Sequence, residues 1–199
     1  TIIDLIGNPA DWTQRDVFLE GIAERFPMDP EPEFIDISAS NLAAVTLQEN
    51  NHIAIIDLPS GQIVSDFSAG SVKHVADLLD DGQIRFSNLL RDSRREPDAI
   101  HWTPDGNLAV ANEGDYDLDV EFVGGRSFTI FTPTGRILFE SGAELERHLA
   151  NAGFYDDSRS DAKGAEPEGI EIADYSGQTY LFVGMERALS RDRLVEHAS

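Results

Sequence analysis

The sequence predicts an all-β fold made of four-stranded antiparallel sheets, each the size of one blade of a β-propeller. Two observations lead to this prediction. Four short β-rich runs, EFIDIS, LAAVTL, HIAIIDL and QIVSDF, follow one another over residues 33–67, and turn residues separate them. A segment that begins with Glu-Pro then occurs three times, at residues 31–35, 96–100 and 166–170, each time with a second apolar strand after it. The sequence therefore indicates about three blades over residues 31–188, together with short peripheral helices.

The N-terminal segment, residues 1–30, precedes the first repeat and is expected to carry a helix at 14–25. Phe18, Ile22 and Phe26 recur there at a spacing of four residues, which places them on one face of a helix. A proline follows directly and would end the helix.

Two long connections interrupt the repeat. Residues 68–95 are of mixed polar composition and are expected to form a loop. Residues 141–165 are expected to contain a short helix, which a capping box of Ser141 and Glu144 would open and Gly153 would end. Long connections in a compact β fold are more often functional than decorative.

The third repeat is shorter than the first two. After its second strand the sequence continues as LSRDRLVEHAS, so residues 189–199 are expected to form a polar tail or helix. Three blades do not close a ring, and an open propeller exposes the edges of its strands. The expected partner of these edges is the remainder of a propeller or another protein subunit.

Composition excludes several classes of protein. Asp and Glu number 37 against 15 Lys and Arg, a net charge of −22, so neither nucleic acid nor an anionic membrane surface is an expected partner. No apolar run reaches the roughly 18 residues that a spanning helix needs, which excludes membrane insertion. Hydrophobic residues make up 41% of the chain, enough for a core, and the absence of cysteine excludes disulfides and thiolate metal sites. The excess of carboxylates suits hard cations.

The repeated glutamates are the main candidates for a functional site. One glutamate opens each repeat, and a second ends the following strand in QEN, NEG or MER. An antiparallel pair of strands brings these two ends to the same rim, where unneutralised carboxylates would repel one another. A hard cation such as calcium is one neutraliser, and arginine or backbone N–H groups are the other. The candidate metal ligands are Glu31, Glu49, Glu96, Glu113, Asp115, Glu166, Glu168 and Glu186.

Few cations are present, and three of them are candidates for binding phosphate: Arg126, Lys163 and Arg187. The alternative is that these side chains neutralise the repeated glutamates. The acidic run DYDLDVE at 115–121 lacks the glycine and the final glutamate of an EF-hand, so its alternating carboxylates are expected on one face of a strand. The sequence contains neither GxSxG nor HExxH, and no catalytic residue is assigned.

Several segments together resemble one known family. The segments TLQENNHIAIIDL, ANEGDYD, GGRSFTIF and RSDAKGAEPEGIE, in this order, are similar to the choice-of-anchor I family. Its members are bacterial propellers described as alkaline phosphatase-like or phytase/esterase-like, and they are related to a mesenchyme-specific cell-surface glycoprotein. The resemblance implies a seven-bladed propeller and export to the periplasm or the cell exterior.

Two functions are compatible with these features. The first is an extracytoplasmic propeller that acts as a binding or assembly module and binds calcium. The alternative is a calcium-dependent phosphoesterase, in which the metal would polarise a phosphoryl oxygen of a phosphate ester and arginine would stabilise the developing charge. The fold alone does not distinguish them, because propellers serve both functions.

Overall fold

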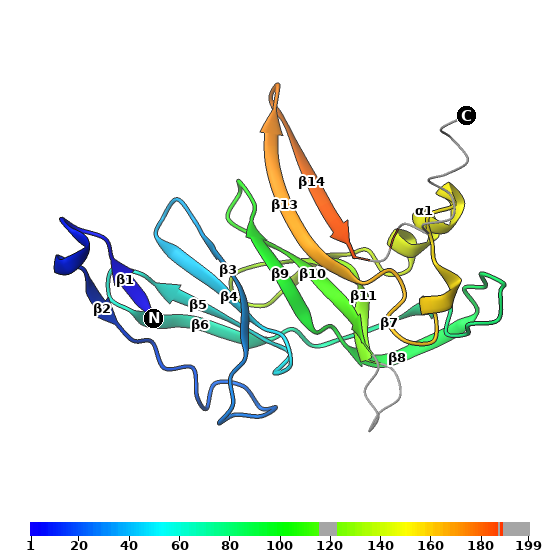
Figure 1. Cartoon of the computed structure of the whole chain (residues 1–199), viewed down its shortest axis with the longest axis horizontal. Coiled ribbons are helices and arrows are strands. Elements are labelled where there is room, and N and C mark those ends of the chain that lie inside the picture. The colour runs from blue at the N-terminus through cyan, green and yellow to red at the C-terminus, as the bar shows by residue number, and fades with distance from the viewer. Residues whose placement is uncertain (116–122, 187, 189–199) are drawn as a thin grey trace.

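The computed structural model describes residues 1–115, 123–186 and 188. Its described part is mostly β-structure, arranged as two four-stranded and three two-stranded antiparallel sheets, with one α-helix. Figure 1 shows these sheets side by side along the long axis of the molecule. The described sheets are open, and the all-β prediction is confirmed at this level.

The first four-stranded sheet is a simple meander in which each strand pairs with the next. Its central strands are apolar on both faces and are buried almost throughout, whereas its last strand alternates between half-buried and exposed residues. Asn41 and Asn51 adopt left-handed backbone conformations in its turns, which asparagine tolerates well. The strands are β3 (Pro32–Ile37), β4 (Leu42–Leu47), β5 (His52–Asp57) and β6 (Gln62–Ser68).

The second four-stranded sheet repeats this order and packs against the first. Its strands are β9 (Pro97–Trp102), β10 (Leu108–Asp115), β11 (Val123–Phe131) and β12 (Ile137–Glu140). Ile53 and Ile55 of the first sheet form one core cluster with Ile100, Leu108 and Phe131 of the second. The two sheets therefore share a dry interface, which fixes their relative position.

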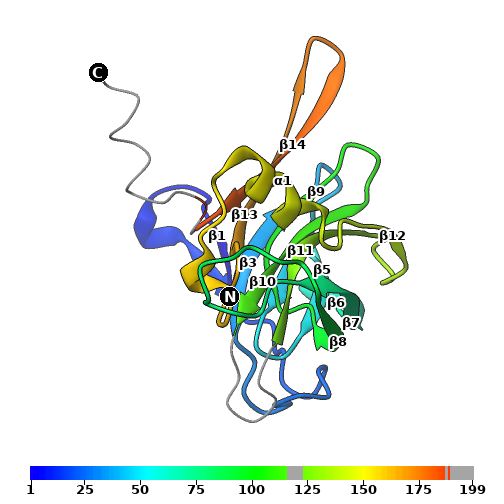
Figure 2. The ribbon, with the colours of Figure 1, turned by 90° about the vertical axis from the view of Figure 1, so that its right-hand side faces the viewer.

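The third repeat forms the hairpin of β13 (Pro167–Tyr175) and β14 (Gln178–Met185). Ile170 packs on Ala99, Ala109 and Ala111 of the second sheet. Further along, the hairpin projects away from the rest of the molecule in both Figure 1 and Figure 2. Strand β3 contacts β9, and β9 contacts β13, so the three strands that begin with the Glu-Pro repeat lie next to one another.

The prediction of a helix at 14–25 is wrong. The N-terminal segment instead forms a small sheet of β1 (Ile2–Asp4) and β2 (Thr13–Arg15), with the 3-10 turn η1 (Pro9–Asp11) between them. After β2 the chain is irregular, and Val17 and Leu19 pack on the first sheet while Phe18 is 73% exposed. This alternation has the period of an extended chain, which competes with the helical spacing.

The loop predicted at 68–95 is also corrected. It contains a hairpin of β7 (Ser71–Ala76) and β8 (Asn88–Arg94). In the second connection, the helix α1 (Glu144–Ala152) forms as predicted and ends at Gly153, which has a φ of 77°. The capping box does not form, because the Ser141 hydroxyl accepts a hydrogen bond from Phe128 N.

Aromatic residues fill the core in part. Trp102 and Phe131 are buried, whereas Phe182, which the repeat would place in the core, is 56% exposed on β14. The predicted polar tail at 189–199 lies outside the described residues. Among the helices that the structure describes, none has the length and apolar character needed to cross a membrane.

Candidate carboxylate site

The structure brings together the two glutamates of each repeat. Glu113 N donates a hydrogen bond to the Glu96 carbonyl oxygen at 3.1 Å, and Glu186 N makes the same bond to Glu166 at 3.0 Å. In the first repeat, the negative charge of Glu49 raises the pKa of the exposed Glu31. The two glutamates are therefore in backbone contact at a common strand end in the second and third repeats.

Glu96 and Glu166 share an unusual backbone conformation. Their φ values are 52° and 54°, in the left-handed region, although each precedes a proline. Such a conformation costs about 1–3 kcal/mol and persists only where the surroundings enforce it. Both residues are buried, and Arg94 Nε donates to Glu96 Oε1 at 3.2 Å. The first residue of the repeat is thus held in place by the fold.

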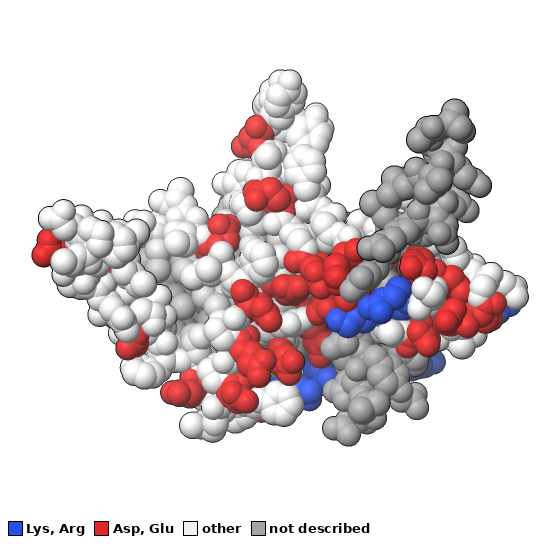
Figure 3. Space-filling model, viewed as in Figure 1, with Lys and Arg blue, Asp and Glu red and all other residues white. Residues whose placement is uncertain are grey.

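Three carboxylates from two sheets converge at one point. Glu113 of β10, Glu166 before β13 and Glu168 on β13 each offer one oxygen, and these oxygens lie within 4.8 Å of one another. We call these three residues the carboxylate cluster. Figure 3 shows acidic side chains gathered over the middle of this face, with a band of Lys and Arg beside them.

Lys163 lies inside this group. Its Nζ is 2.9 Å from Glu113 Oε1 and 3.0 Å from Glu166 Oε1. On the other side of Glu166, Arg159 Nη2 donates to Oε2 at 3.0 Å. Burial lowers the pKa of Lys163, but its hydrogen bonds to Glu113 and Glu166 outweigh this effect, so the pKa is raised. The side chain remains an ammonium ion that partly neutralises the carboxylate cluster.

Further carboxyl groups with raised pKa values lie around Lys163. Burial, followed by the charges of Glu113 and Glu168, raises the pKa of Asp98 to about 7. Burial and the neighbouring Glu186 likewise raise the pKa of Glu168. Asp98 was not among the predicted ligands, yet it occupies the same place in its Glu-Pro repeat as Glu168. The repeat itself was therefore the signal that could have identified Asp98.

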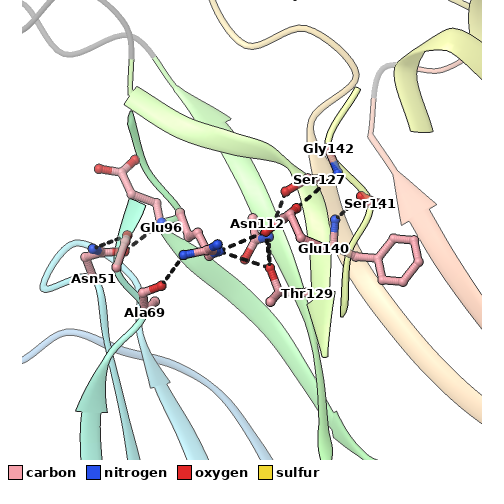
Figure 4. Close-up of polar contacts among 12 residues, drawn as sticks. Asn51, Ala69, Glu96, Asn112, Ser127, Thr129, Glu140, Ser141 and Gly142 are labelled. Atoms are coloured by element: carbon pink, nitrogen blue, oxygen red, sulfur yellow. Dashed lines mark hydrogen bonds and ion pairs between the residues drawn. The ribbon is translucent and has the colours of Figure 1, made fainter. Parts of the chain in front are cut away.

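Polar contacts also join the first and second sheets near the cluster. Gln48, just after β4, donates a hydrogen bond to Glu113 Oε2, and Glu96 N donates to Asn51 Oδ1 at 3.0 Å. Figure 4 shows Asn51 beside Glu96, and Asn112 between Ser127 and Thr129. These contacts fix the end of β10, from which Glu113 projects.

The predicted phosphate ligands have different locations. Lys163 lies in the carboxylate cluster, whereas Arg126 is fully buried and donates to the backbone carbonyls of Asp77, Ser160 and Ala162. Arg126 therefore faces the interior rather than a surface that a phosphate ester reaches. Arg187 lies outside the described residues, as does the side chain of Asp115.

Glu146 of α1 is fully buried beside Arg126. Burial raises its pKa to about 7, although the positive charge of Arg126 opposes this change. A carboxyl group with a raised pKa stabilises the fold at low pH, and this contribution is lost as the pH rises through the folded-state value. Glu146 therefore destabilises the folded state at neutral and alkaline pH.

We expect wild-type protein to lose stability relative to Glu146→Gln between pH 4.5 and pH 8. The difference should reach up to about 3 kcal/mol, because one pKa unit corresponds to about 1.4 kcal/mol. Urea unfolding of both proteins at several pH values measures it. A constant difference between the two free energies of unfolding over this range would contradict the expectation.

A second polar contact joins the same three strands, five residues after the glutamate that opens each repeat. His101 of β9 reaches Asp36 of β3 through Nδ1 at 3.4 Å and Glu171 of β13 through Nε2 at 2.9 Å. A cavity of about 590 Å³ adjoins them and is lined by the turns at 38–40 and 103–106. The sequence alone does not indicate a role for His101, since an isolated histidine in a strand has no recognisable spacing.

The comparisons with known proteins identify the family. No curated protein matches the chain. The family model of the choice-of-anchor I domain matches residues 9–121 and 118–192, which together span both four-stranded sheets and the β13–β14 hairpin. The chain belongs to the choice-of-anchor I family.

Proposed function

We propose that this chain is an extracytoplasmic binding or assembly module, that its sheets are successive propeller blades, and that the carboxylate cluster binds a divalent cation. The family name implies a cell-surface or extracytoplasmic protein. A propeller arrangement is supported by the equal strand order of the two four-stranded sheets and by the contacts of β3 with β9 and of β9 with β13. In a propeller, the first strands of neighbouring blades meet around a central channel.

The single observation that carries the cation proposal is the convergence of Glu113, Glu166 and Glu168 within 4.8 Å. Calcium is the cation best suited to them, because it takes six to eight oxygen ligands and tolerates irregular geometry. The raised pKa of Asp98 supports the same view, because its largest causes after burial are the negative charges of Glu113 and Glu168.

Thermal melting tests this proposal. We expect EDTA to lower the melting temperature, calcium to restore it, and Glu168→Gln to abolish the response, because a ligand that binds only the folded state stabilises it. The matched control is Glu171→Gln on the same strand, outside the carboxylate cluster, which should keep the calcium response. A wild-type melting temperature that EDTA and calcium both leave unchanged would refute cation binding.

The phosphoesterase alternative has less support. Among the residues that the structure describes, Lys163 and Arg159 are cations at the cluster, and both already pair with glutamates. We therefore expect no hydrolysis of p-nitrophenyl phosphate above the buffer rate, with or without calcium. Calcium-dependent hydrolysis that Glu168→Gln abolishes would instead favour an enzyme.

A further inference from the structure

Lys163 reaches the carboxylate cluster from an irregular stretch of chain. We call residues 157–166 the Lys163 segment; it begins with the 3-10 turn η2 (Asp157–Arg159) and ends at β13. The segment carries Arg159 and Glu166 as well as Lys163. Several of its backbone N–H groups bond within the segment, to the carbonyls of Asp157 and Arg159. Its remaining backbone polar groups need partners from elsewhere.

Arg126 of β11 supplies two of these partners. Its Nη1 donates to the Ser160 carbonyl at 3.0 Å, and its Nη2 donates to the Ala162 carbonyl at 2.9 Å. Nη1 also donates, at 3.1 Å, to the carbonyl of Asp77, the first residue after β7. The guanidinium fork thus fixes the segment on both sides of Asp161. Arg126 itself has a φ of 50°, a conformation that its surroundings must enforce.

Glu146 of α1 supplies another hydrogen-bond partner for the Lys163 segment. Its Oε1 accepts a hydrogen bond from Ala165 N at 3.1 Å. The backbone comes so close that a Cβ atom added to Gly164 would lie 2.2 Å from Glu146 Oε1 and 2.8 Å from Arg126 Nη1. Glycine at 164 is therefore required by the two buried side chains as well as by its φ of 62°.

The segment is also close to β10. A Cβ atom added to Gly114 would lie 2.0 Å from the Lys163 carbonyl oxygen and 2.8 Å from Arg126 Cγ. The backbone around Lys163 is thus packed closely against Gly114 as well as against the pair of Arg126 and Glu146. These close contacts leave the backbone of Lys163 little room to move, whereas its side chain can still reorient.

We infer that Arg126 and Glu146 are a positioning pair, which holds the Lys163 segment so that Lys163 serves as a built-in cation of the carboxylate cluster. A divalent cation would then bind in competition with the Lys163 ammonium group. This competition rests on the proposed function, whereas the positioning by Arg126 and Glu146 does not depend on it.

Two opposite charges buried near each other are by themselves a weak explanation for the presence of these two residues. Apolar side chains of similar volume often stabilise a fold as well as a buried pair does. Apolar residues would not, however, satisfy the Ser160 and Ala162 carbonyls or the Ala165 N–H group, all of which belong to the segment that carries Lys163. The contacts made by the pair therefore point to placement of this segment.

Acylation of lysine tests the inference, because the chain contains only two lysines, Lys163 and the exposed Lys73. Folded protein in EDTA is treated with an acetylating N-hydroxysuccinimide ester, and the rate at each lysine is followed by mass spectrometry. In wild-type protein we expect Lys163 to react much more slowly than Lys73. Arg126→Lys keeps the positive charge but loses the planar guanidinium group that donates to two carbonyls. Lys163 should then react about tenfold faster, because hydrogen bonds from a charged donor are lost.

Controls separate local placement from global unfolding. Arg91→Lys on an exposed strand position and Glu144→Gln on the exposed face of α1 should leave the Lys163 rate unchanged. Glu146→Gln is a milder variant that decides the question if Arg126→Lys fails to fold, and it should raise the Lys163 rate about threefold, the effect of weakening one hydrogen bond. Each variant should keep a native circular dichroism spectrum and a cooperative urea transition, which shows that it is folded under the acylation conditions.

Two results bear on different parts of the inference. A Lys163 rate equal to wild type in the folded Arg126→Lys or Glu146→Gln protein would overturn the positioning role. Added calcium should raise the Lys163 rate in wild-type protein by displacing its ammonium group from the glutamates. Failure of calcium alone to do so would overturn the competition and count against the proposed function, while the positioning result would stand.

Discussion

Arg126→Met should destabilise the protein by about 3–5 kcal/mol, because it leaves buried carbonyl groups unsatisfied and a buried carboxyl group without its nearby positive charge. The change leaves the carbonyls of Asp77, Ser160 and Ala162 without their donor. It also removes the positive charge beside the buried Glu146, whose pKa should then rise further. Urea unfolding at pH 7 measures the loss, and the unfolding midpoint should fall with little change in slope.

Arg91→Met is the matched control, because Arg91 is exposed on β8. Its free energy of unfolding should stay within about 0.5 kcal/mol of wild type, as is usual for surface substitutions. Equal effects of the two substitutions would show that the carbonyl contacts of Arg126 contribute nothing to stability.

Lys163→Met should have the second largest effect, a loss of about 3 kcal/mol at low ionic strength. Glu113 and Glu166 are nearly buried, and Lys163 lies about 3 Å from both. Without the ammonium group these carboxylates lose the cation that they share, while the ion pair of Arg159 with Glu166 remains. Calcium should restore much of the lost stability in this variant, because it would then bind without competition from Lys163.

The control for this substitution is Lys73→Met, which removes the same charge at an exposed position of β7. It should leave both the melting temperature and the calcium response at their wild-type values. If Lys163→Met proves as stable as Lys73→Met, the ion pairs in the carboxylate cluster do not stabilise the fold.

Much of the fold could be predicted because the strands of the repeats are short, apolar and separated by turn residues. Strands β3 to β6 lie where the four β-rich runs predicted them. The helix at 14–25 was wrong because Val17 and Leu19 form an alternating pattern that binds the first sheet as an extended chain. The hairpin of β7 and β8 was missed because its strands are mostly polar and carry no clear period.

The candidate site could be predicted only as far as the repeat determines it. Equivalent places in successive repeats brought Glu96 and Glu113, and Glu166 and Glu186, into backbone contact. The sequence offered a cation or a basic side chain as neutraliser, and the structure shows Lys163 in that place. The pairing of Arg159 with Glu166 and the burial of Arg126 were not predictable, because they depend on how an irregular segment folds onto distant backbone.

Isothermal titration of calcium into EDTA-treated protein is the most direct test of the carboxylate cluster as a cation site. The cluster predicts one calcium ion per chain in wild-type protein, with a dissociation constant of about 0.1–1 mM, as in extracellular calcium modules. Lys163→Met should bind more tightly, and Glu168→Gln should not bind measurably. Absence of binding to both wild-type protein and Lys163→Met would contradict the assignment of Glu113, Glu166 and Glu168 as a cation site.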